Sequence, residues 1–341
     1  MDLIKIGTIA FPLNAPVLAT ENSKSDLKGN IYLEYTDSAQ IAAQLTQGAV
    51  RTETSSALLP VRKLDLDSGQ QIEYRAPSIP DYPDQLRASF NVSADGSFFL
   101  LVKAYHSDPY KNLTRPSFFI ERFNEDGSFD SRTELAQPPS RYLNASAFGV
   151  FGDGTFLIVG TLSPAFPPRH VEAFAGLFSA SGSFIKNVEL GQPHGNNNPK
   201  PLLSPGYSMS HSSLLSAPDG SIYLIRDTNP LEVLVILPGG VVSKDVQLKI
   251  PVSGLSPTES GLIGPDLLYA KFSYIPTYPP VEKTPESLIA TIDMNSEQFE
   301  NFYHVPQPNN NMRIASDLSG HIFVLSWTVD NKLEVVKYAI R

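Results

Sequence analysis

The chain has no cysteine among its 341 residues, which excludes disulfide bonds and thiol chemistry. Basic residues are scarce: 26 Lys and Arg stand against 35 Asp and Glu, and the formal net charge is −9. This acidic balance argues against a nucleic-acid partner, because phosphate binding requires a basic face. No apolar run approaches the roughly 20 residues needed to span a bilayer, so no transmembrane segment is expected.

The familiar motifs of catalytic sites are missing as well. The chain contains no nucleophile elbow, phosphate-binding loop, dinucleotide glycine pattern or zinc signature. Its first residues, MDLIKIGTIA, lack the basic start and the long apolar stretch of a signal peptide. Plentiful Asn, Ser, Pro and Tyr favour a bacterial protein that is periplasmic or secreted, in a mature form without its signal peptide. A cytosolic location is the alternative.

A repeated hairpin organises the rest of the chain. In its clearest copy, the turn Asp219-Gly220 is followed by the apolar run 222–225. An Asp-Gly pair between apolar runs predicts a tight turn, because glycine adopts the positive φ that the turn needs. A continuously apolar run is typical of a strand covered on both faces. Further copies have turns at Asp95-Gly96 and Asp153-Gly154, and weaker ones at Gly29, Asp266 and Gly320.

A second, more polar hairpin alternates with the first. Its turn positions are 55 to 58 residues apart and fall at Gly69, Gly127, Gly182, Gly240 and Ser296. A period this steady indicates a repeat architecture, and each unit offers four antiparallel strands, as a propeller blade does. Six units of about 57 residues match the length of the chain. We therefore predict an all-β, six-bladed β-propeller with four-stranded antiparallel blades, forming a single domain over residues 1–341.

The last unit supplies only three strands before the chain ends. The N-terminal segment, residues 3–9, is apolar and otherwise has no partner. We expect this segment to complete the last blade and close the ring, because closure removes two exposed sheet edges.

Binding is expected on the face of the ring that carries the long loops, since long loops on a rigid scaffold commonly hold binding sites. Tyr105 and Tyr274 lie in or beside these loops and offer flat aromatic contact area. The inner strands begin around the central channel, about nine residues before each turn glycine. The polar residues near these positions are His211, Arg87, Asn144, Asn311 and Arg313. Such a ring can hold an anion or a hydrated ion, or it can be a solvated plug.

The stretch PDGSIYLIRD (218–227), followed by an outer hairpin that turns at Gly239-Gly240, resembles six-bladed propellers of the NHL-repeat type and their lactonase-like relatives. In calcium-dependent lactonase relatives, the resemblance implies a channel metal held by Glu, Asn and Asp. In amidating-lyase relatives, it implies zinc held by histidines at the starts of inner strands. The positions of this chain that come into question for Ca or Zn are His211, Glu259 and Asn144.

Two hypotheses follow, and whether the protein is an enzyme stays open between them. The first is a non-catalytic propeller scaffold without a cofactor, which binds a protein, peptide, carbohydrate or other small ligand on its long-loop face. The second is a metal-assisted hydrolase or lactonase that acts at the channel mouth, with His211, Asn144, Glu259 and Asn311 as its candidate residues.

Overall fold

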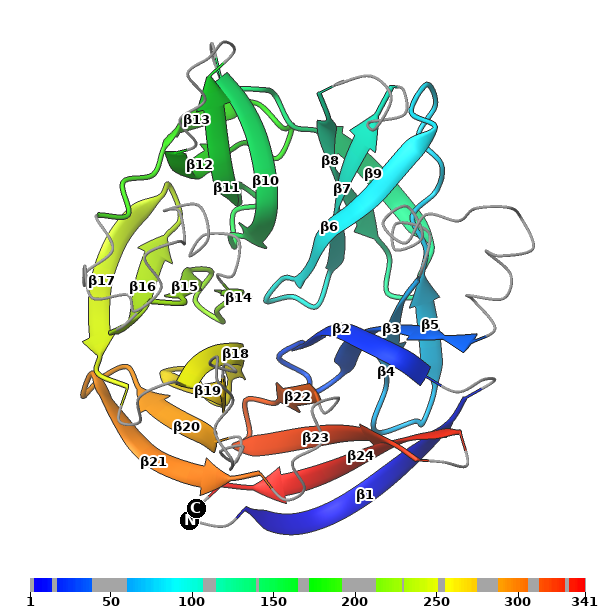
Figure 1. Cartoon of the computed structure of the whole chain (residues 1–341), viewed down its shortest axis with the longest axis vertical. Coiled ribbons are helices and arrows are strands. Elements are labelled where there is room, and N and C mark those ends of the chain that lie inside the picture. Colours follow the sequence, from blue (N-terminus) through cyan, green and yellow to red (C-terminus); the bar gives the residue numbers. More distant parts are fainter. Residues whose placement is uncertain are drawn as a thin grey trace, which may run out of the picture.

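The computed structural model describes residues 3–13, 17–38, 60–106, 115–138, 141–164, 172–191, 213–228, 230–250, 255–274, 288–305, 313–328 and 331–340. The elements formed by these residues are strands, arranged as six four-stranded antiparallel sheets around a ring (Figure 1). The prediction of a six-bladed propeller is confirmed. Within the described residues there is no helix with the length and apolar character that crossing a bilayer demands.

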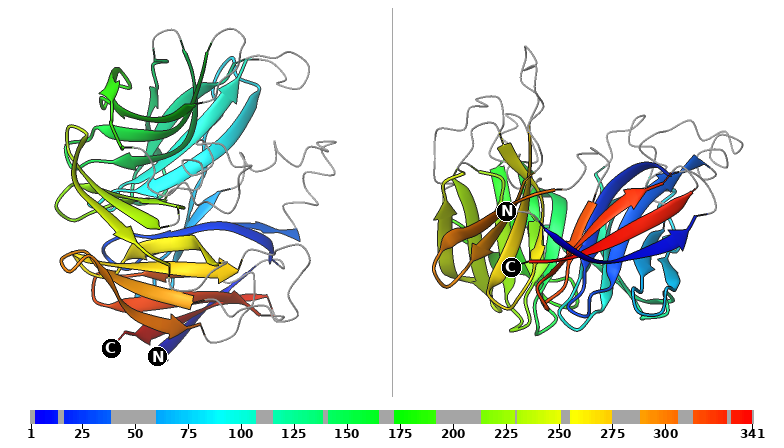
Figure 2. Two further views of the ribbon diagram at one scale, coloured as in Figure 1. Left: turned by 60° about the vertical axis from the view of Figure 1, so that its left-hand side comes forward. Right: turned by 90° about the horizontal axis from the view of Figure 1, so that it is seen from below.

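Each blade has an inner strand beside the axis and an outer strand at the rim. The first three blades are β2–β5 (Val17–Ser25, Ile31–Asp37, Val61–Leu64, Gln71–Tyr74), β6–β9 (Asp84–Val92, Phe98–Tyr105, Ser117–Phe123, Phe129–Glu134) and β10–β13 (Arg141–Val150, Phe156–Pro164, Glu172–Phe178, Phe184–Asn187). The next two are β14–β17 (Ser213–Ser216, Ile222–Arg226, Leu231–Leu237, Val241–Leu248) and β18–β21 (Leu255–Leu262, Leu267–Tyr274, Leu288–Asp293, Gln298–His304). The sixth has β22 (Arg313–Ser316), β23 (His321–Trp327), β24 (Lys332–Ala339) and β1 (Ile4–Pro12). The six blades stand side by side around the ring in Figure 2.

Strand β1 closes the ring, as the strand count predicted. It pairs antiparallel with β24, with Phe11 opposite Leu333 and Thr8 opposite Val336. The pairing extends to Pro12, three residues beyond the predicted end of the strand. Phe11 is 1% exposed and packs in a cluster with Leu333, so burial of this ring adds to the ladder hydrogen bonds that hold the two chain ends together.

The tight turns between inner and second strands have the predicted chemistry. Gly220 has φ +82°, a conformation that a side chain would strain. The Asp219 carboxylate accepts hydrogen bonds from the Ser221 amide (3.0 Å) and the Ser221 hydroxyl (2.6 Å), which fixes the turn. Asp153 and Thr155 repeat this arrangement in the third blade.

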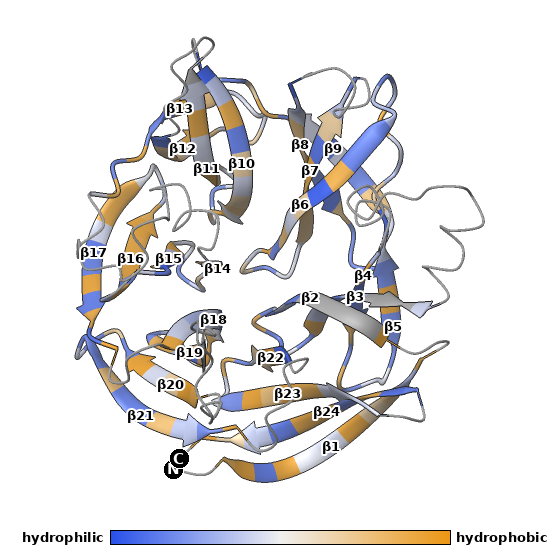
Figure 3. Ribbon diagram, in the orientation of Figure 1, coloured by the Kyte–Doolittle hydropathy of each residue, from blue (hydrophilic) through white to orange (hydrophobic). Residues whose placement is uncertain are grey.

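The hydrophobic core lies between the faces of neighbouring blades. One cluster joins Leu157 of the third blade to Ile222, Leu224 and Leu234 of the fourth, all fully buried. In Figure 3 apolar residues gather on the middle strands, and polar residues recur along the rim. Rim strand β17 alternates exposed and less exposed side chains, as expected of a strand with one solvated face.

Hydrogen bonds also link the inner strands of adjacent blades. Ser216 Oγ donates to the Val150 carbonyl (3.0 Å), Ser316 Oγ to the Leu262 carbonyl (2.6 Å) and Asn91 Nδ2 to the Phe148 carbonyl (2.5 Å). An inner strand has a free edge, so these side chains satisfy carbonyl groups that no ladder reaches. The wall of the channel is therefore held in a defined register from blade to blade.

Candidate functional site

The channel wall is made by six inner strands, β2, β6, β10, β14, β18 and β22 (Figure 1). Each inner strand runs from the long-loop face to a tight turn. We call the side on which the inner strands begin the loop end of the channel, and the side with the tight turns the turn end.

An ion pair joins the first two blades at the loop end. Arg87 on β6 contacts the carboxylate of Glu34 on β3, and the two side chains are only 3% and 5% exposed. Asn22 Nδ2 donates to the second oxygen of Glu34 (3.3 Å). A charge pair this deeply buried requires good geometry on both sides, because each charge has lost its hydration. The pair therefore locks these two blades in position.

A second charged group joins the fifth and sixth blades. Glu259 on β18 accepts hydrogen bonds from Lys271 Nζ (3.2 Å) and Arg313 Nη1 (2.9 Å) through one oxygen. Its other oxygen accepts the Ile314 amide (2.6 Å). One carboxylate thus faces two cations.

A third contact joins the second and third blades. Lys103 Nζ on β7 donates to the Asn144 side-chain oxygen on β10 (3.2 Å), and this contact is exposed. The ammonium also lies 5.5 Å from the centre of the Tyr105 ring, within the range of a cation–π interaction. These partners of Lys103 are thus a neutral amide and an aromatic ring. Farther from the axis, the buried pair of Arg226 and Glu232 (2.7 Å) is neutral as a whole.

Lys24 crosses the channel closer to the turn end than these contacts. It belongs to β2 in the first blade, and its Nζ donates to the Leu214 carbonyl on β14 in the fourth blade (3.3 Å). These blades stand on opposite sides of a ring of six (Figure 1). The ammonium also lies 5.8 Å from the centre of the Phe90 ring. Burial lowers the pKa of Lys24 to about 8, since desolvation disfavours the charged form.

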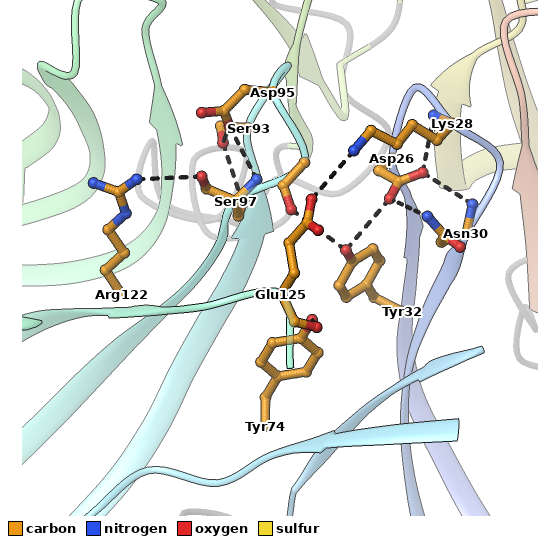
Figure 4. A network of polar contacts seen from close by, with 11 residues as sticks. Asp26, Lys28, Asn30, Tyr32, Tyr74, Ser93, Asp95, Ser97, Arg122 and Glu125 are labelled. Atoms are coloured by element: carbon orange, nitrogen blue, oxygen red, sulfur yellow. Dashed lines mark hydrogen bonds and ion pairs between the residues drawn. The ribbon is translucent and has the colours of Figure 1, made fainter. Parts of the chain in front are cut away.

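The turn end is closed by hydrogen bonds within and between turns (Figure 4). Asp26 accepts the amides of Lys28 and Asn30, both at 2.9 Å, and the Asn30 side-chain amide at 2.7 Å. Tyr32 donates to the same carboxylate (3.3 Å), and its hydroxyl is 3.5 Å from the Gly96 carbonyl of the next blade. The Asp26 oxygens are therefore fully engaged in holding the turn.

The residues proposed from sequence have the following places. Arg87, Asn144, Glu259 and Arg313 all lie on inner strands at the loop end, in the contacts described above. The Tyr105 ring is buried, with 8% exposure, and packs in the blade. The Tyr274 backbone ends β19 opposite Leu255. His211 and Asn311, and the side chain of Tyr274, lie outside the described residues.

Sequence reasoning missed four charged residues of the channel: Lys24, Glu34, Lys103 and Lys271. A usable signal existed for Glu34, Lys103 and Lys271, because each interrupts the apolar run of the second strand in its blade. Glu34 follows the run 31–33, and Lys271 follows the run 267–270. A charge inside such a run is costly to bury without a partner, so it indicates a specific contact.

The metal that the family resemblance implies can be tested on two of its three candidate residues. Both Glu259 oxygens already accept hydrogen bonds, and two of the donors are cations. The Asn144 oxygen accepts a third cation. A divalent ion prefers anionic oxygens without competing cations, so these two residues do not fit a metal site in this arrangement. No group of three or more His, Asp or Glu suited to a metal occurs in the described ranges.

Fold and site together define a six-bladed propeller with a charged channel that Lys24 crosses. No family model matches the chain, and no curated protein matches its sequence. It is similar to a protein of unknown function from Dyadobacter fermentans DSM 18053, with 11% identity, 99% of each chain covered and a TM-score of 0.59. It is also similar to a luciferin-regenerating enzyme, with 10% identity, 98% and 96% covered and a TM-score of 0.50. Likenesses this distant establish the fold alone, and the NHL-repeat type stays a prediction.

Proposed function

We propose that this protein is a non-catalytic binding propeller whose ligand is a small carboxylate, such as an acidic sugar, held on the long-loop face at the channel mouth. The observation that carries the proposal is the charge at the loop end. The three contacts described there contain four cations and two carboxylates, in a chain with a net charge of −9. Within these three contacts cations thus outnumber carboxylates, which supports an anionic ligand.

A recess with low-dielectric walls strengthens such a local field and attracts ligands of opposite charge. Arg and Lys side chains recognise carboxylates through charge-assisted hydrogen bonds, which are stronger than neutral ones. Lys103 is suited to make this contact, because its hydrogen-bond acceptor is a neutral amide and the contact is exposed. Arg87 and Arg313 are tied to carboxylates and supply field more than direct contact.

The test is thermal unfolding with matched pairs of sugars, for example galacturonate against galactose. A ligand that binds only the folded state raises the melting temperature, because it stabilises that state by RT ln(1 + L/Kd), where L is the free ligand concentration. We expect the acidic sugar to raise it and the neutral sugar to leave it unchanged.

Lys103→Gln should abolish most of this shift. The matched control is Lys28→Gln, because Lys28 is an exposed lysine at the turn end, paired with Glu125 (3.2 Å). Equal shifts from the two sugars, or equal loss in the two variants, would contradict the proposal.

A further inference from the structure

A small cavity lies on the axis of the ring beside Lys24. Its volume is about 30 Å³, and it is bounded by strands from the first, second, fourth and fifth blades. A polar cavity of 10 to 15 Å³ already holds one water molecule, so this one accommodates one or two small particles. The residues that carry polar side chains at its wall include Lys24, Asp26, Asn91, Ser216, Ser260 and Tyr269.

Lys24 brings an ammonium group with unused donors to this cavity. An ammonium group has three N–H donors, and the contact to the Leu214 carbonyl uses one. Among the described residues, no carboxylate forms an ion pair with Lys24, and the only cause that lowers its pKa is desolvation. The Asp26 carboxylate also lines the cavity, but its oxygens are held by donors of its own turn. An ammonium without a direct ion-pair partner costs stability, and a bound anion would reduce that cost.

Ser260 brings a spare hydroxyl. Its Oγ is buried and has no hydrogen-bond partner among the described residues. In the first blade, Ser23 Oγ donates to the Ile314 carbonyl of the neighbouring inner strand (3.0 Å). The Leu214 carbonyl, at the position of β14 that corresponds to Ile314, accepts Lys24 and is not a hydrogen-bond partner of Ser260. A buried hydroxyl without a partner is rare in native structures, so an occupant of the cavity is the natural acceptor.

The other polar side chains of the wall are already satisfied. Asn91, Ser216 and Tyr269 each donate to a backbone carbonyl of an adjacent inner strand, at 2.5, 3.0 and 2.9 Å. The Asp26 carboxylate accepts four hydrogen bonds in its own turn. The unused groups at the cavity are therefore the donors of Lys24 and Ser260, which require an acceptor.

We propose that this axial cavity binds one monatomic anion, a halide such as chloride, between the Lys24 ammonium and the Ser260 hydroxyl. Carboxylates and phosphate are too large for the volume, and water lacks the charge that Lys24 requires. The site lies closer to the turn end than the loop-end contacts, and this proposal is independent of the proposed sugar binding. Its ligand neutralises the core of the ring and ties the first blade to the fourth and fifth.

The test is anomalous diffraction from crystals grown without halide and soaked in bromide. We expect a bromide peak within hydrogen-bond distance of Lys24 Nζ and Ser260 Oγ in the wild type, and no peak there in Lys24→Met. Electron density for water without an anomalous signal, or an equal peak in Lys24→Met, would overturn the proposal.

Ser260→Ala provides a second test if Lys24→Met does not crystallise. A hydrogen bond to a charged group typically contributes enough to change affinity tenfold or more. We therefore expect the bromide concentration for half occupancy to rise at least tenfold in Ser260→Ala. The matched control is Ser243→Ala, an exposed serine at the rim, which should leave it unchanged. An unchanged value in Ser260→Ala would also contradict the proposal.

Discussion

The two ends of the channel treat charge in opposite ways. At the loop end, Arg87, Lys271 and Arg313 each face a carboxylate, and these groups join one blade to the next. Lys24, nearer the turn end, contacts a carbonyl on the far side of the ring and the aromatic ring of Phe90, and it forms no ion pair among the described residues. A buried pair is self-sufficient, whereas a buried single charge is a cost that the rest of the structure must offset. The paired charges of the loop end therefore hold the ring together, whereas the Lys24 ammonium favours binding of a ligand.

The aspartates of the turn end follow yet another pattern. Asp26, Asp95, Asp153, Asp219 and Asp317 accept backbone amides of their own turns, at 2.9 to 3.0 Å, and Figure 4 shows the first two. Desolvation raises the pKa of Asp95, but hydrogen bonds from the Ser93 hydroxyl and the Ser97 amide outweigh it and lower the pKa. These carboxylates are structural. Substitutions of the paired charges, of Lys24 and of the turn aspartates should therefore change the free energy of unfolding by different amounts, and not all in the same direction.

The largest effect is expected when a buried pair is broken. Glu34→Gln removes the carboxylate that Arg87 faces while conserving its shape, and should lower the free energy of unfolding by about 3 to 5 kcal/mol. Replacing both partners, as in Glu34→Leu with Arg87→Met, should restore much of the loss because no charge stays buried. Urea unfolding curves of the wild type and the two variants measure these free energies. A cost below about 1 kcal/mol for Glu34→Gln would show that the pair does not lock the blades.

Lys24→Met should act in the other direction. Without halide at pH 7, it should raise the free energy of unfolding by about 3 kcal/mol, since it removes an ammonium whose pKa burial lowers from 10.5 to about 8. The wild type carries this cost in full below pH 8, and the cost disappears as the pH rises to 10.5. Wild-type stability relative to Lys24→Met should therefore increase across that window.

The groups around Lys24 do not obscure this pH dependence. The charged neighbour at the cavity is Asp26, held in its turn by four donors. Tyr269 also lines the cavity, and burial raises the pKa of its hydroxyl well above 10. Chemical unfolding at pH 7, 9 and 10.5 tests the prediction. The same change of unfolding free energy with pH in the wild type and in Lys24→Met would contradict it.

The turn aspartates should give smaller losses. Asp219→Ala deletes the acceptor of the Ser221 amide and hydroxyl and should cost about 1 kcal/mol. Asp153→Ala, in the same turn of the next blade, is the matched variant and should cost a similar amount. Thermal unfolding followed by circular dichroism compares them. Losses of the size expected for Glu34→Gln would erase the distinction between the two ends.

The smallest effect is expected for an exposed pair at the turn end. Glu125→Gln removes the partner of Lys28, and the two side chains are 70% and 63% exposed. Solvent screens such a pair, so the change in unfolding free energy should stay below about 1 kcal/mol and shrink further in salt. A larger loss that persists in salt would show that exposure alone does not separate the two kinds of ion pair.

The architecture could be predicted because its signals are local and periodic. Glycine turns such as Gly220 and the apolar run after each recur at a nearly constant spacing, and a missing strand revealed the role of β1. Arg87 and Arg313 could be proposed because they lie at a nearly fixed distance from a turn.

The rest of the site depends on contacts that spacing does not encode. Lys24 lies closer to its turn than the positions considered, and its acceptor, Leu214, is 190 residues away and adjacent only because the ring closes. Bulges in β6, β10 and β18 also shift the count along the inner strands, so equal spacing does not mean equal depth in the channel.

The central claim is that the partly buried Lys24 ammonium binds an anion, unlike the paired charges of the loop end. The most direct test compares the unfolding free energies of the wild type and Lys24→Met in methanesulfonate and in chloride at the same ionic strength and pH 7. We predict that Lys24→Met is the more stable protein in methanesulfonate, and that chloride narrows the difference in unfolding free energy by stabilising the wild type alone. A difference that chloride leaves unchanged, or no difference in methanesulfonate, would contradict the account.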